Sequence, residues 1–482
     1  MLCVSKRLFD SWNSAGLRYC HWKSNEHLLP GLNGETDLDV LLSKEDRDEG
    51  ERCLRSLDFL PCQSQFGSRY PDVEDWIGFD DQTGRLIHLH LHYRLATGHK
   101  GLKEYSLPWA EEMLQHRILD TETGVYVADP GIELVTLYTR IALKVALKDL
   151  GKLRKGCYHV DPSTLKEIAY LKERVDWPAV SDFVARHYGQ NGEAVMRIIQ
   201  AERFDGKAIH RMKQLAERQF RKDNRLGRAN RWLEFYYRHA VKFRKTLRNR
   251  FHANLVIRKV PKSGRGLQIA FLGQDGAGKT TVTRDIRKWW SWKMDVRYIY
   301  LGSGDNYFSW RKVLQKVIPS SAPFKLIRAW LQVSKYKQLA KDVLSMIKSG
   351  ERFSRKGGLV IYDRYPQVTY PGISDGPKIR EKMMAKMPSS IRSLLAGYAK
   401  KEERLLKEAA SHHPDIVFKL VIPPEESVRR KPENKLETMV RKHELIKSLQ
   451  FEGSDVHLID ATMPYEKEIV QIKQIIWRHL QK

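Results

Sequence analysis

Two patterns of apolar and polar positions run along this chain of 482 residues and predict two kinds of domain. In the C-terminal part, short and almost wholly apolar segments alternate with segments whose apolar residues recur at helical spacing. The apolar segments are 267–273, 296–301, 358–363, 414–422 and 456–460. Strands that are apolar on both faces and alternate with helices are typical of a parallel sheet covered on both sides. We therefore expect an α/β domain with a doubly wound parallel sheet over residues 266–482.

The N-terminal part shows shorter patterns. Residues 86–93 alternate between apolar residues and histidines, which predicts a strand with one polar face. Residues 37–42 predict another strand, preceded by a turn at Gly34. From about residue 130 to residue 210 the apolar spacing becomes helical. We expect an α+β domain over residues 1–205, with its helical half as scaffold.

The first strand of the C-terminal domain leads into a phosphate-binding motif. Residues 273–280 fit G-x-x-x-x-G-K-[ST] at every fixed position, and a helical pattern follows. A strand, a glycine loop and a helix in this order direct backbone N–H groups and the positive helix end at phosphate oxygens. The residues expected to contact the nucleotide are Gly273, Asp275, Gly276, Ala277, Gly278, Lys279, Thr280 and Thr281. The alternative, a glycine-rich turn that fits by chance, leaves the flanking strand and helix unexplained.

Four charged or polar residues have distinct expected roles. Lys279 supplies a positive charge for the β and γ phosphates, and the Thr280 hydroxyl is placed to bind Mg²⁺. Asp363 ends an apolar strand, where a carboxylate can hold the metal shell opposite Thr280. Arg364 is suited to a substrate phosphate, because a guanidinium group binds two oxygens at once. The alternative for Asp363 and Arg364 is a surface ion pair at a strand end.

These pieces together resemble the thymidylate kinases, within the nucleoside-monophosphate kinases. The matching segments are 271–281, 363–365, 414–415, 424–429 and 459–461, in the family's order. The resemblance implies an ATP- and Mg²⁺-dependent phosphotransferase with a mobile lid. The implied roles are acceptor contact for Asp275, metal proximity for Asp363, acceptor phosphate binding for Arg364, lid residues Arg429, Arg430 and Lys431, and adenine proximity for Asp460 and Ala461.

The departures from the family concern the acceptor. The family usually has an Arg/Glu-Pro element after the second strand, whereas residues 302–305 are Gly-Ser-Gly-Asp here. The pattern expected to recognise thymine is not evident over residues 335–347. Gly276 stands where some members carry a catalytic arginine, and such help then comes from the lid. We expect ATP as donor and, in place of dTMP, a different nucleotide or another small or glycan-linked acceptor.

Residues 17–42 resemble the nucleotidyltransferase superfamily, and more closely a bacterial branch with H-W-K-S and G-E-T-D-L-D elements. Asp37 and Asp39 share one face of their strand, which suits a divalent cation. His90 stands where the superfamily expects a third carboxylate, and Gly-Glu-Thr replaces its usual Gly-Ser. The implied activity is nucleotidyl transfer through Asp37 and Asp39. The alternatives are a degenerate domain, and histidines that merely line the polar face of a half-solvated sheet.

Positive charge is concentrated between the two domains. The chain carries a formal net charge of +27, and residues 207–265 contain 19 Lys and Arg against three acidic residues. Within this stretch the residues that recur at helical spacing are Trp232, Phe235, Tyr236, His239, Phe243 and Leu247. We expect a basic helical connector over residues 206–265 that binds an anionic membrane surface or another polyanion. The alternative is an aromatic stripe that packs on one of the domains.

Composition limits the class of protein. Hydrophobic residues make up 41 % and charged residues 30 %, as in globular proteins, and no secretory signal or membrane span is evident. The five cysteines, of which Cys157 is the last, include no C-x-x-C pair and suit a reducing compartment. We expect a cytoplasmic enzyme, either free or peripheral at the inner face of the membrane, with a homodimer among the open alternatives. The competing functions are an ATP-binding regulatory module without an acceptor and a nucleotidyltransferase.

Overall fold

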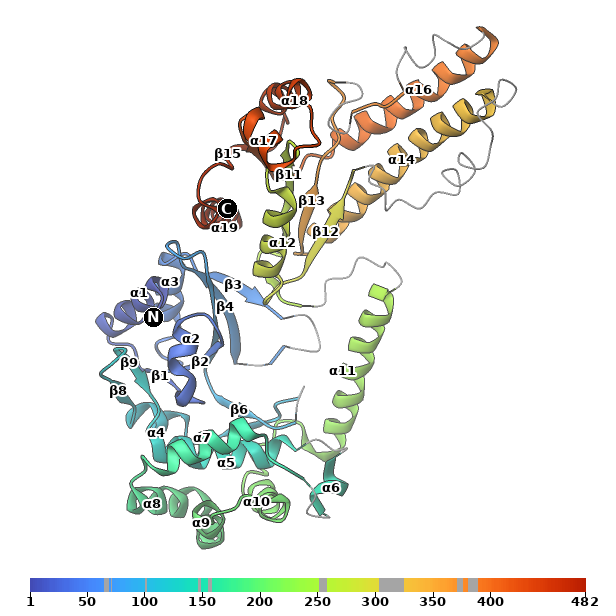
Figure 1. The fold of residues 1–482 in the computed structure, drawn as a ribbon. Coiled ribbons are helices and arrows are strands. Elements are labelled where there is room, and N and C mark those ends of the chain that lie inside the picture. Colours follow the sequence, from blue (N-terminus) through green and yellow to red (C-terminus); the bar gives the residue numbers. More distant parts are fainter. Residues whose placement is uncertain are drawn as a thin grey trace. The chain divides into compact units, whose positions relative to one another are not determined.

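The computed structural model describes residues 1–64, 69–70, 72–99, 102–145, 149–154, 158–250, 258–302, 325–370, 376–379 and 389–482. The chain divides into two compact units, an N-terminal unit of residues 1–250 and a C-terminal unit of residues 251–480 (Figure 1). Cys157 and residues 303–305, which belong to the segment that departs from the kinase pattern, lie outside the described residues.

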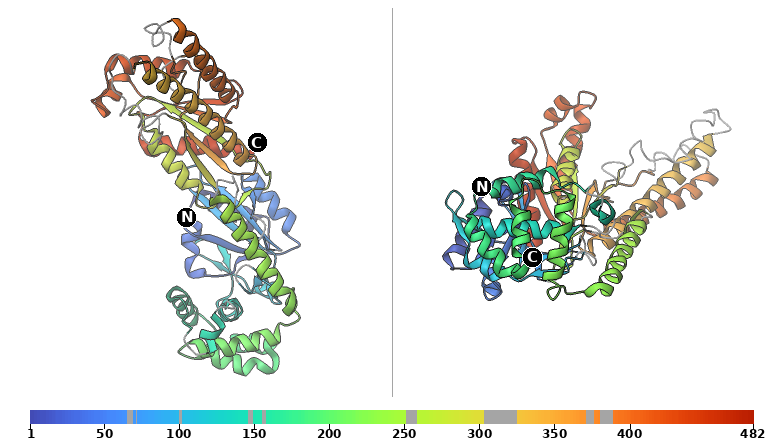
Figure 2. Two further views of the ribbon diagram at one scale, coloured as in Figure 1. Left: turned by 90° about the vertical axis from the view of Figure 1, so that its right-hand side faces the viewer. Right: turned by 90° about the horizontal axis from the view of Figure 1, so that it is seen from below.

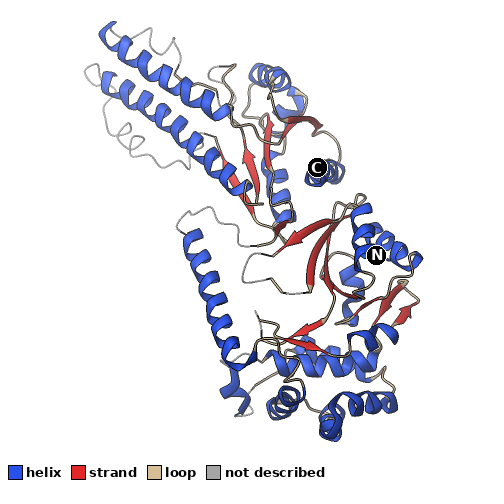
Figure 3. Ribbon diagram, turned by 180° about the vertical axis from the view of Figure 1, so that it is seen from behind, coloured by secondary structure: helices blue, strands red, loops and turns tan. Residues whose placement is uncertain are grey.

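The N-terminal unit contains one large mixed sheet and a group of helices (Figure 3). Its strands are β1 (Tyr19–His21), β2 (Asp37–Leu42), β3 (Leu60–Gln63), β4 (Val73–Phe79), β5 (Leu86–His92), β6 (Leu95–Thr97), β7 (Tyr105–Leu107), β8 (Ile118–Asp120) and β9 (Val125–Val127). Its helices are α1 (Cys3–Ser14), η1 (Asn25–His27), α2 (Leu28–Leu32), α3 (Arg47–Ser56), α4 (Ala110–Gln115), α5 (Pro130–Lys144), α6 (Leu150–Arg154), α7 (Pro162–Lys172), α8 (Trp177–Tyr188), η3 (Gly189–Asn191), α9 (Gly192–Gln200), α10 (Gly206–Gln219) and α11 (Gly227–Arg250). Within this unit the strand order is β3-β4-β5-β2-β1-β9-β8, and β6 pairs with β7.

Strand periodicity gives this sheet two different faces. Leu38 and Val40 of β2 and Leu89 and Leu91 of β5 lie in the hydrophobic core that also contains residues of α1 and α3. The residues between them, Asp37 and Asp39 on β2 and the three histidines of β5, therefore belong to the opposite face. The predicted turn before β2 is present, since Gly34 has a φ of 69°. A second core contains residues of α5 and α7 to α10, the helical half predicted from the sequence.

The predicted basic connector begins inside the N-terminal unit. Ile209 and Met212 of α10 are part of its second core, so α10 is scaffold. Helix α11 follows and extends along the flank of this unit (Figure 2). The side chains of Trp232, Tyr236 and Phe243 are exposed by 41, 63 and 68 %. These three members of the stripe are therefore exposed, whereas Phe235 is half-buried.

The C-terminal unit is built on the predicted parallel sheet. Its strands are β10 (Val260–Pro261), β11 (Gln268–Gly273), β12 (Val296–Tyr300), β13 (Leu359–Asp363), β14 (Ile416–Val421) and β15 (Asp455–Asp460). Its helices are α12 (Lys279–Trp290), α14 (Lys325–Ser354), α16 (Ser389–Ala410), α17 (Pro424–Arg430), α18 (Leu436–Ser448) and α19 (Tyr465–Gln481). Five strands pair in the order β12-β13-β11-β14-β15, and all neighbours are parallel.

The strand order sets where a ligand can bind. From β11 the chain crosses to β12 on one side, and after β13 it crosses to β14 on the other side. The carboxyl end of β11 is therefore the point where the winding reverses, the usual ligand site of open parallel sheets. Helices α14 and α18 share one core with alternate residues of the strands, such as Ala270 and Tyr362. Helices α14 and α16 lie side by side (Figure 1).

Of the helices that the structure describes, none combines the length and the apolar character that a membrane span requires.

Candidate functional site

The glycine loop at the carboxyl end of β11 has the backbone conformation of a phosphate-binding loop. Gly276 and Gly278 have φ values of 86° and 84°, which side-chain-bearing residues rarely adopt. Gly273 lies so close to β14 that an added Cβ would stand 2.7 Å from the carbonyl oxygen of Leu420. Helix α12 then begins at Lys279, at the end of the loop. The loop is therefore a strand-to-helix turn that turns its backbone toward one site.

The lysine of the motif is held at this loop. Lys279 Nζ donates hydrogen bonds to the carbonyl oxygens of Gly273 (2.8 Å) and Gln274 (2.9 Å). Thr280 lies in the first turn of α12 and is exposed. Of the remaining predicted contacts, Ala277 is buried and Thr281 is exposed. The loop thus brings the ammonium group of Lys279 and the exposed hydroxyl group of Thr280 to the first turn of α12.

Asp363 ends β13, directly beside β11. Its backbone pairs with Phe271, and its carboxylate Oδ2 accepts a hydrogen bond from the Tyr298 hydroxyl at 2.7 Å. The residue is only 4 % exposed, and its Oδ1 atom has no hydrogen-bond partner among the described residues. Such a buried, unsatisfied carboxylate oxygen is costly unless an ion or water binds it. Asp363 and Thr280 therefore offer the hard oxygen ligands that Mg²⁺ prefers.

Arg364, which follows Asp363, has an uncommon backbone conformation. Its φ is 74°, in the left-handed region, and its N–H donates to the carbonyl oxygen of Phe271 at 3.0 Å. Its guanidinium group lies over the ring of Tyr300, 5.7 Å from the ring centre. Strained backbone of this kind persists where the surroundings impose it, often at functional sites.

The predicted lid arginines differ in what they contact. Arg429 is exposed and binds Glu426 at 2.6 Å. Arg430, the next residue, donates to the carbonyl oxygens of Gly276 (3.1 Å) and Ala461 (3.2 Å). Of the two predicted lid arginines, Arg430 is therefore the one that contacts the glycine loop. The predicted adenine contact Ala461 is buried beside it.

Asp275, the acidic residue of the loop, is paired with a lysine of α18. Lys442 Nζ lies 2.6 Å from Asp275 Oδ2. Burial alone would raise the pKa of Asp275, but the hydrogen bond and charge of Lys442 outweigh it and lower that pKa. Ser427 of α17 donates to the backbone carbonyl of Asp275 at 2.6 Å. Sequence reasoning missed Lys442 and Tyr298, because neither belongs to a local motif, and it gave no role to Ser427 although that residue lies within the matching segment 424–429.

A buried glutamate near the lid gives a pH-dependent prediction. Burial raises the pKa of Glu468 on α19 to about 7, from an ordinary value of 4.5. Between these two pH values the unfolded chain has lost the proton that the folded chain retains, so stability falls as pH rises. Glu468→Gln removes this cost. We expect the melting temperature of the variant, relative to wild type, to increase from pH 5 to pH 7.5 in differential scanning fluorimetry. A difference that is constant over this pH range would contradict the assignment.

In the N-terminal unit, the sheet brings the predicted carboxylates and histidines together. Strands β2 and β5 are parallel neighbours whose register pairs Asp37 with His88 and Asp39 with His90. His88 Nδ1 lies 2.7 Å from Asp37 Oδ1, and His90 Nδ1 lies 3.3 Å from Asp39 Oδ1. The ligand atoms of Asp37, His88 and His90 lie within 4.8 Å of one another, as do those of Asp39, His90 and His92. Carboxylate and imidazole groups in this arrangement can hold a divalent metal ion.

A third carboxylate, which the sequence interpretation missed, completes this group. Asp75 on β4 accepts contacts from His90 Nε2 (3.1 Å) and His88 Nε2 (3.2 Å) at its Oδ1 atom. Burial would lower the pKa of His90, but hydrogen bonds to Asp39 and Asp75 outweigh it and raise that pKa. Asp75 joins this group because β4 pairs with β5 and places Asp75 opposite His90. Local sequence patterns do not show which strands pair, so the sequence could not identify Asp75.

A lysine already compensates the charge of this group. Lys23 Nζ lies 2.5 Å from Asp39 Oδ1. Burial would raise the pKa of Asp39, but the Lys23 ammonium group and the hydrogen bonds from His90 and His92 outweigh it, so that pKa lies well below its usual range. A metal ion at Asp39 would therefore have to share this carboxylate with Lys23.

The ion pair of Lys23 and Asp39 predicts a strong effect on stability. Asp39→Asn removes the nearer counter-charge of the half-buried Lys23 ammonium group and leaves only Asp37, which we expect to cost up to about 3 kcal/mol, the lower end of the range for breaking a buried ion pair. We expect a correspondingly lower free energy of unfolding of the N-terminal unit in urea titrations followed by circular dichroism. Adding Lys23→Met to this variant is expected to recover part of the loss. Equal stability of wild type and Asp39→Asn would show that the pair is not a structural ion pair.

The chain was compared with family models, with known proteins and with solved structures. No family model matches the chain. It is 26 % identical over 224 residues to the uncharacterized ATP-binding protein YghR of Escherichia coli K12, covering 43 % of this chain and 86 % of that protein. It is 27 % identical over 229 residues to the uncharacterized ATP-binding protein YghS of the same strain, covering 42 % and 89 %. The solved deoxyadenosine kinase from M. mycoides with bound dATP has 17 % identity and a TM-score of 0.27, covering 44 % and 99 %, a likeness that supports no argument here.

Proposed function

We propose that the C-terminal unit is an ATP- and Mg²⁺-dependent phosphotransferase of the P-loop kinase type that resembles thymidylate kinase. The observation that carries this proposal is the glycine loop at the reversal point of a parallel sheet, with the Asp363 carboxylate on the adjacent strand. The names of the two relatives, which describe them as ATP-binding proteins, support ATP as the nucleotide that this unit binds. The acceptor is a nucleotide or another small or glycan-linked molecule.

The chain's own residues supply alignment and positive charge. Lys279 binds the β and γ phosphates when it exchanges its two backbone carbonyl partners for phosphate oxygens. Arg364 binds the acceptor phosphate, and Arg430 and Arg429 add charge from the lid when it closes. Mg²⁺ held by Thr280 and Asp363 would neutralise charge on the transferring phosphoryl group.

The proposal is tested by ³¹P NMR of ATP, Mg²⁺ and the purified protein against a panel of acceptors. The panel contains dTMP, other nucleoside monophosphates, sugar phosphates and anionic glycans. Appearance of ADP together with a new phosphorylated product supports the proposal and names the acceptor. ATP binding without transfer to any acceptor, with or without slow hydrolysis, favours the alternative of an ATP-binding regulatory module.

Nucleotidyl transfer in the N-terminal unit is a second candidate, favoured by the group of Asp37, Asp39 and the histidines of β5. This activity would transfer a nucleoside monophosphate and release pyrophosphate. It predicts loss of activity in Asp37→Ala but not in Lys279→Ala. Loss of activity in Lys279→Ala but not in Asp37→Ala would assign the activity to the C-terminal unit. The aspartates and histidines of the N-terminal sheet would then have a structural role.

We also propose that α11 binds an anionic membrane surface. Exposed aromatic side chains at Trp232, Tyr236 and Phe243 beside basic residues such as Arg244 are typical of interfacial helices. The protein is expected to sediment with vesicles of phosphatidylglycerol but not with vesicles of phosphatidylcholine. Trp232→Ser with Phe243→Ser is expected to reduce this binding, whereas exposed Lys166→Gln on α7 is the control. Equal sedimentation of the double variant and wild type would contradict the proposal.

A further inference from the structure

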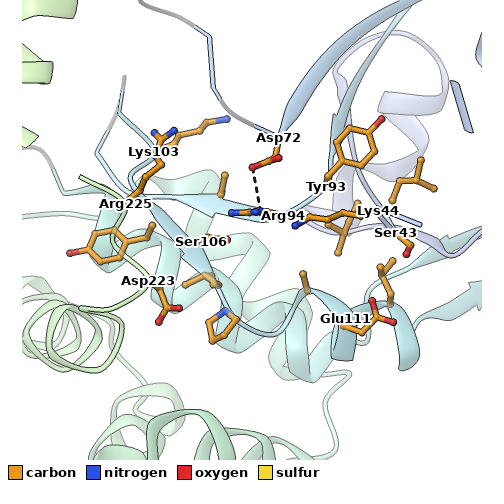
Figure 4. Close-up of a pocket in the computed structure, with 18 of the residues that line it drawn as sticks. Ser43, Lys44, Asp72, Tyr93, Arg94, Lys103, Ser106, Glu111, Asp223 and Arg225 are labelled. Atoms are coloured by element: carbon orange, nitrogen blue, oxygen red, sulfur yellow. Dashed lines mark ion pairs between the residues drawn. The ribbon is translucent and has the colours of Figure 1, made fainter. Parts of the chain in front are cut away.

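A pocket of about 590 Å³ lies within the N-terminal unit (Figure 4). Segments far apart in the sequence line it: residues 41–45 at the end of β2, residues 93–96 after β5, residues 103–111 and residues 222–225. The aspartates and histidines of the sheet face are not among its lining residues in the described chain. A volume of this size is within the usual range of small-molecule sites.

Backbone hydrogen bonds hold the pocket's most distant segment in place. Ser106 N–H donates to the carbonyl oxygen of Asp223 (3.1 Å), and Arg225 N–H donates to the carbonyl oxygen of Glu104 (2.9 Å). Tyr105 and Asn224 form an isolated bridge between them. The chain after α10 therefore runs beside β7 like a short added strand. Part of the basic segment predicted from the sequence thus becomes one wall of this pocket.

The acidic residues of the lining are compensated. Glu45 and Glu111 share Arg18 as their partner (2.8 and 2.7 Å), Asp72 pairs with Arg94 (3.3 Å), and Glu104 Oε1 contacts His99 Nδ1 (2.6 Å). Burial raises the pKa of the fifth, Asp223, above its ordinary value. Four of the five carboxylates of the lining are therefore already engaged with basic side chains.

Its basic residues, by contrast, are mostly uncompensated. Lys44, Lys103, Lys222 and Arg225 form no ion pair with any residue that the structure describes. Figure 4 shows Arg94 in the middle of the pocket, with Lys44 on one side and Lys103 and Arg225 on the other. Lys103 has a φ of 46°, an uncommon conformation that tends to persist at ligand sites. Burial, helped by the charge of Lys23, lowers the pKa of Lys103 to about 8.

We propose that this pocket binds a small diphosphate-bearing molecule, with its phosphates between Lys44, Arg94 and Arg225. A concave site lined by Lys44 and Arg225, which form no ion pair in the described chain, attracts a compact polyanion. Arg94 would exchange its Asp72 partner for a phosphate oxygen, since guanidinium groups match phosphate oxygens in geometry. Basic groups on both sides of Arg94 suit two linked phosphates better than one. The remaining lining, which includes Tyr93 and Ser106, leaves room for an organic group. This site is independent of the proposed kinase activity.

The test measures binding of inorganic pyrophosphate by isothermal titration calorimetry at physiological salt. The full-length Lys279→Ala protein is used, so that the phosphate loop of the C-terminal unit contributes little. We expect one site per chain. Lys44→Gln and Arg225→Gln, added separately, are each expected to weaken binding about tenfold or more, because each removes a charged hydrogen-bond donor. Neither substitution breaks an ion pair that the structure describes, so both variants are expected to fold.

A matched control and two outcomes decide the proposal. Lys166→Gln on α7 changes the same charge outside the pocket and is expected to leave pyrophosphate binding unchanged. Loss of binding in Lys44→Gln and Arg225→Gln with an unchanged melting temperature supports the site. Absence of pyrophosphate binding in the Lys279→Ala protein would overturn it. Binding that all three variants retain equally would overturn it as well, since the anion would then bind elsewhere.

Discussion

Lys279→Ala is expected to lower ATP-dependent phosphoryl transfer by about a hundred- to a thousandfold, with little change in stability. The magnitude is that of removing one preorganised charge from the transferring group. The fold is expected to persist because the Lys279 side chain lies at the loop surface of the sheet and not in its core, with hydrogen bonds to the carbonyl oxygens of Gly273 and Gln274. The measurement is the initial rate of ADP formation with the acceptor found by ³¹P NMR, alongside thermal unfolding.

The same helix offers a control for this substitution. Lys288→Ala lies on the exposed side of α12, two turns beyond the loop, and changes net charge by the same amount. It is expected to leave the rate unchanged. A Lys279→Ala protein that retains the wild-type rate would contradict a phosphotransferase of the P-loop type, and equal losses in both variants would point to a general effect of charge.

Local sequence patterns predicted the core of the C-terminal site. The glycine loop, its strand and its helix are contiguous in sequence, so one motif specifies all three, and the structure confirms the expected parallel sheet. Asp363 was recognisable because an apolar strand that ends in a charged residue places that residue at the carboxyl edge of a sheet. These features depend on periodicity and on chain order, which the sequence displays directly.

The remaining contacts of both sites could not be predicted because they join distant parts of the chain. Tyr298 binds Asp363 across 65 residues, and Lys442 binds Asp275 across 167 residues. Neither Tyr298 nor Lys442 stands in a motif, and only the strand order and the packing of α18 bring them to the loop. Arg429 and Arg430 are adjacent at the end of α17 and therefore point in different directions. Which of them contacts the glycine loop depends on how α17 is rotated about its axis, and the sequence does not show this.

The N-terminal unit shows the same limit in another form. Alternation in β5 correctly predicted a shared histidine face, but the third carboxylate, Asp75, comes from β4. The compensating charge comes from Lys23 on the loop after β1. The concentration of positive charge in residues 207–265 was visible in the sequence. The sequence did not show that this basic segment has three parts. They are the core helix α10, the pocket-lining residues 222–225 and the exposed helix α11.

Asp363→Asn is expected to lower the rate of phosphoryl transfer by about a hundredfold and to raise the Mg²⁺ concentration needed for half-maximal rate. The amide is the same size as the carboxylate, and its oxygen can still accept the hydrogen bond from Tyr298, so the strand end is expected to keep its structure. What the substitution removes is the negative charge at a buried oxygen that no described residue satisfies.

Tyr298→Phe separates this metal-binding role from simple packing. It keeps the charge of Asp363 and removes only the hydrogen bond to Oδ2, so we expect a smaller loss of rate and a nearly unchanged Mg²⁺ requirement. Rates are measured over a titration of Mg²⁺ at saturating ATP. If Asp363→Asn and Tyr298→Phe lose rate equally at every Mg²⁺ concentration, Asp363 acts by holding the end of β13 in place. A loss in Asp363→Asn that added Mg²⁺ partly restores assigns the carboxylate to the metal shell.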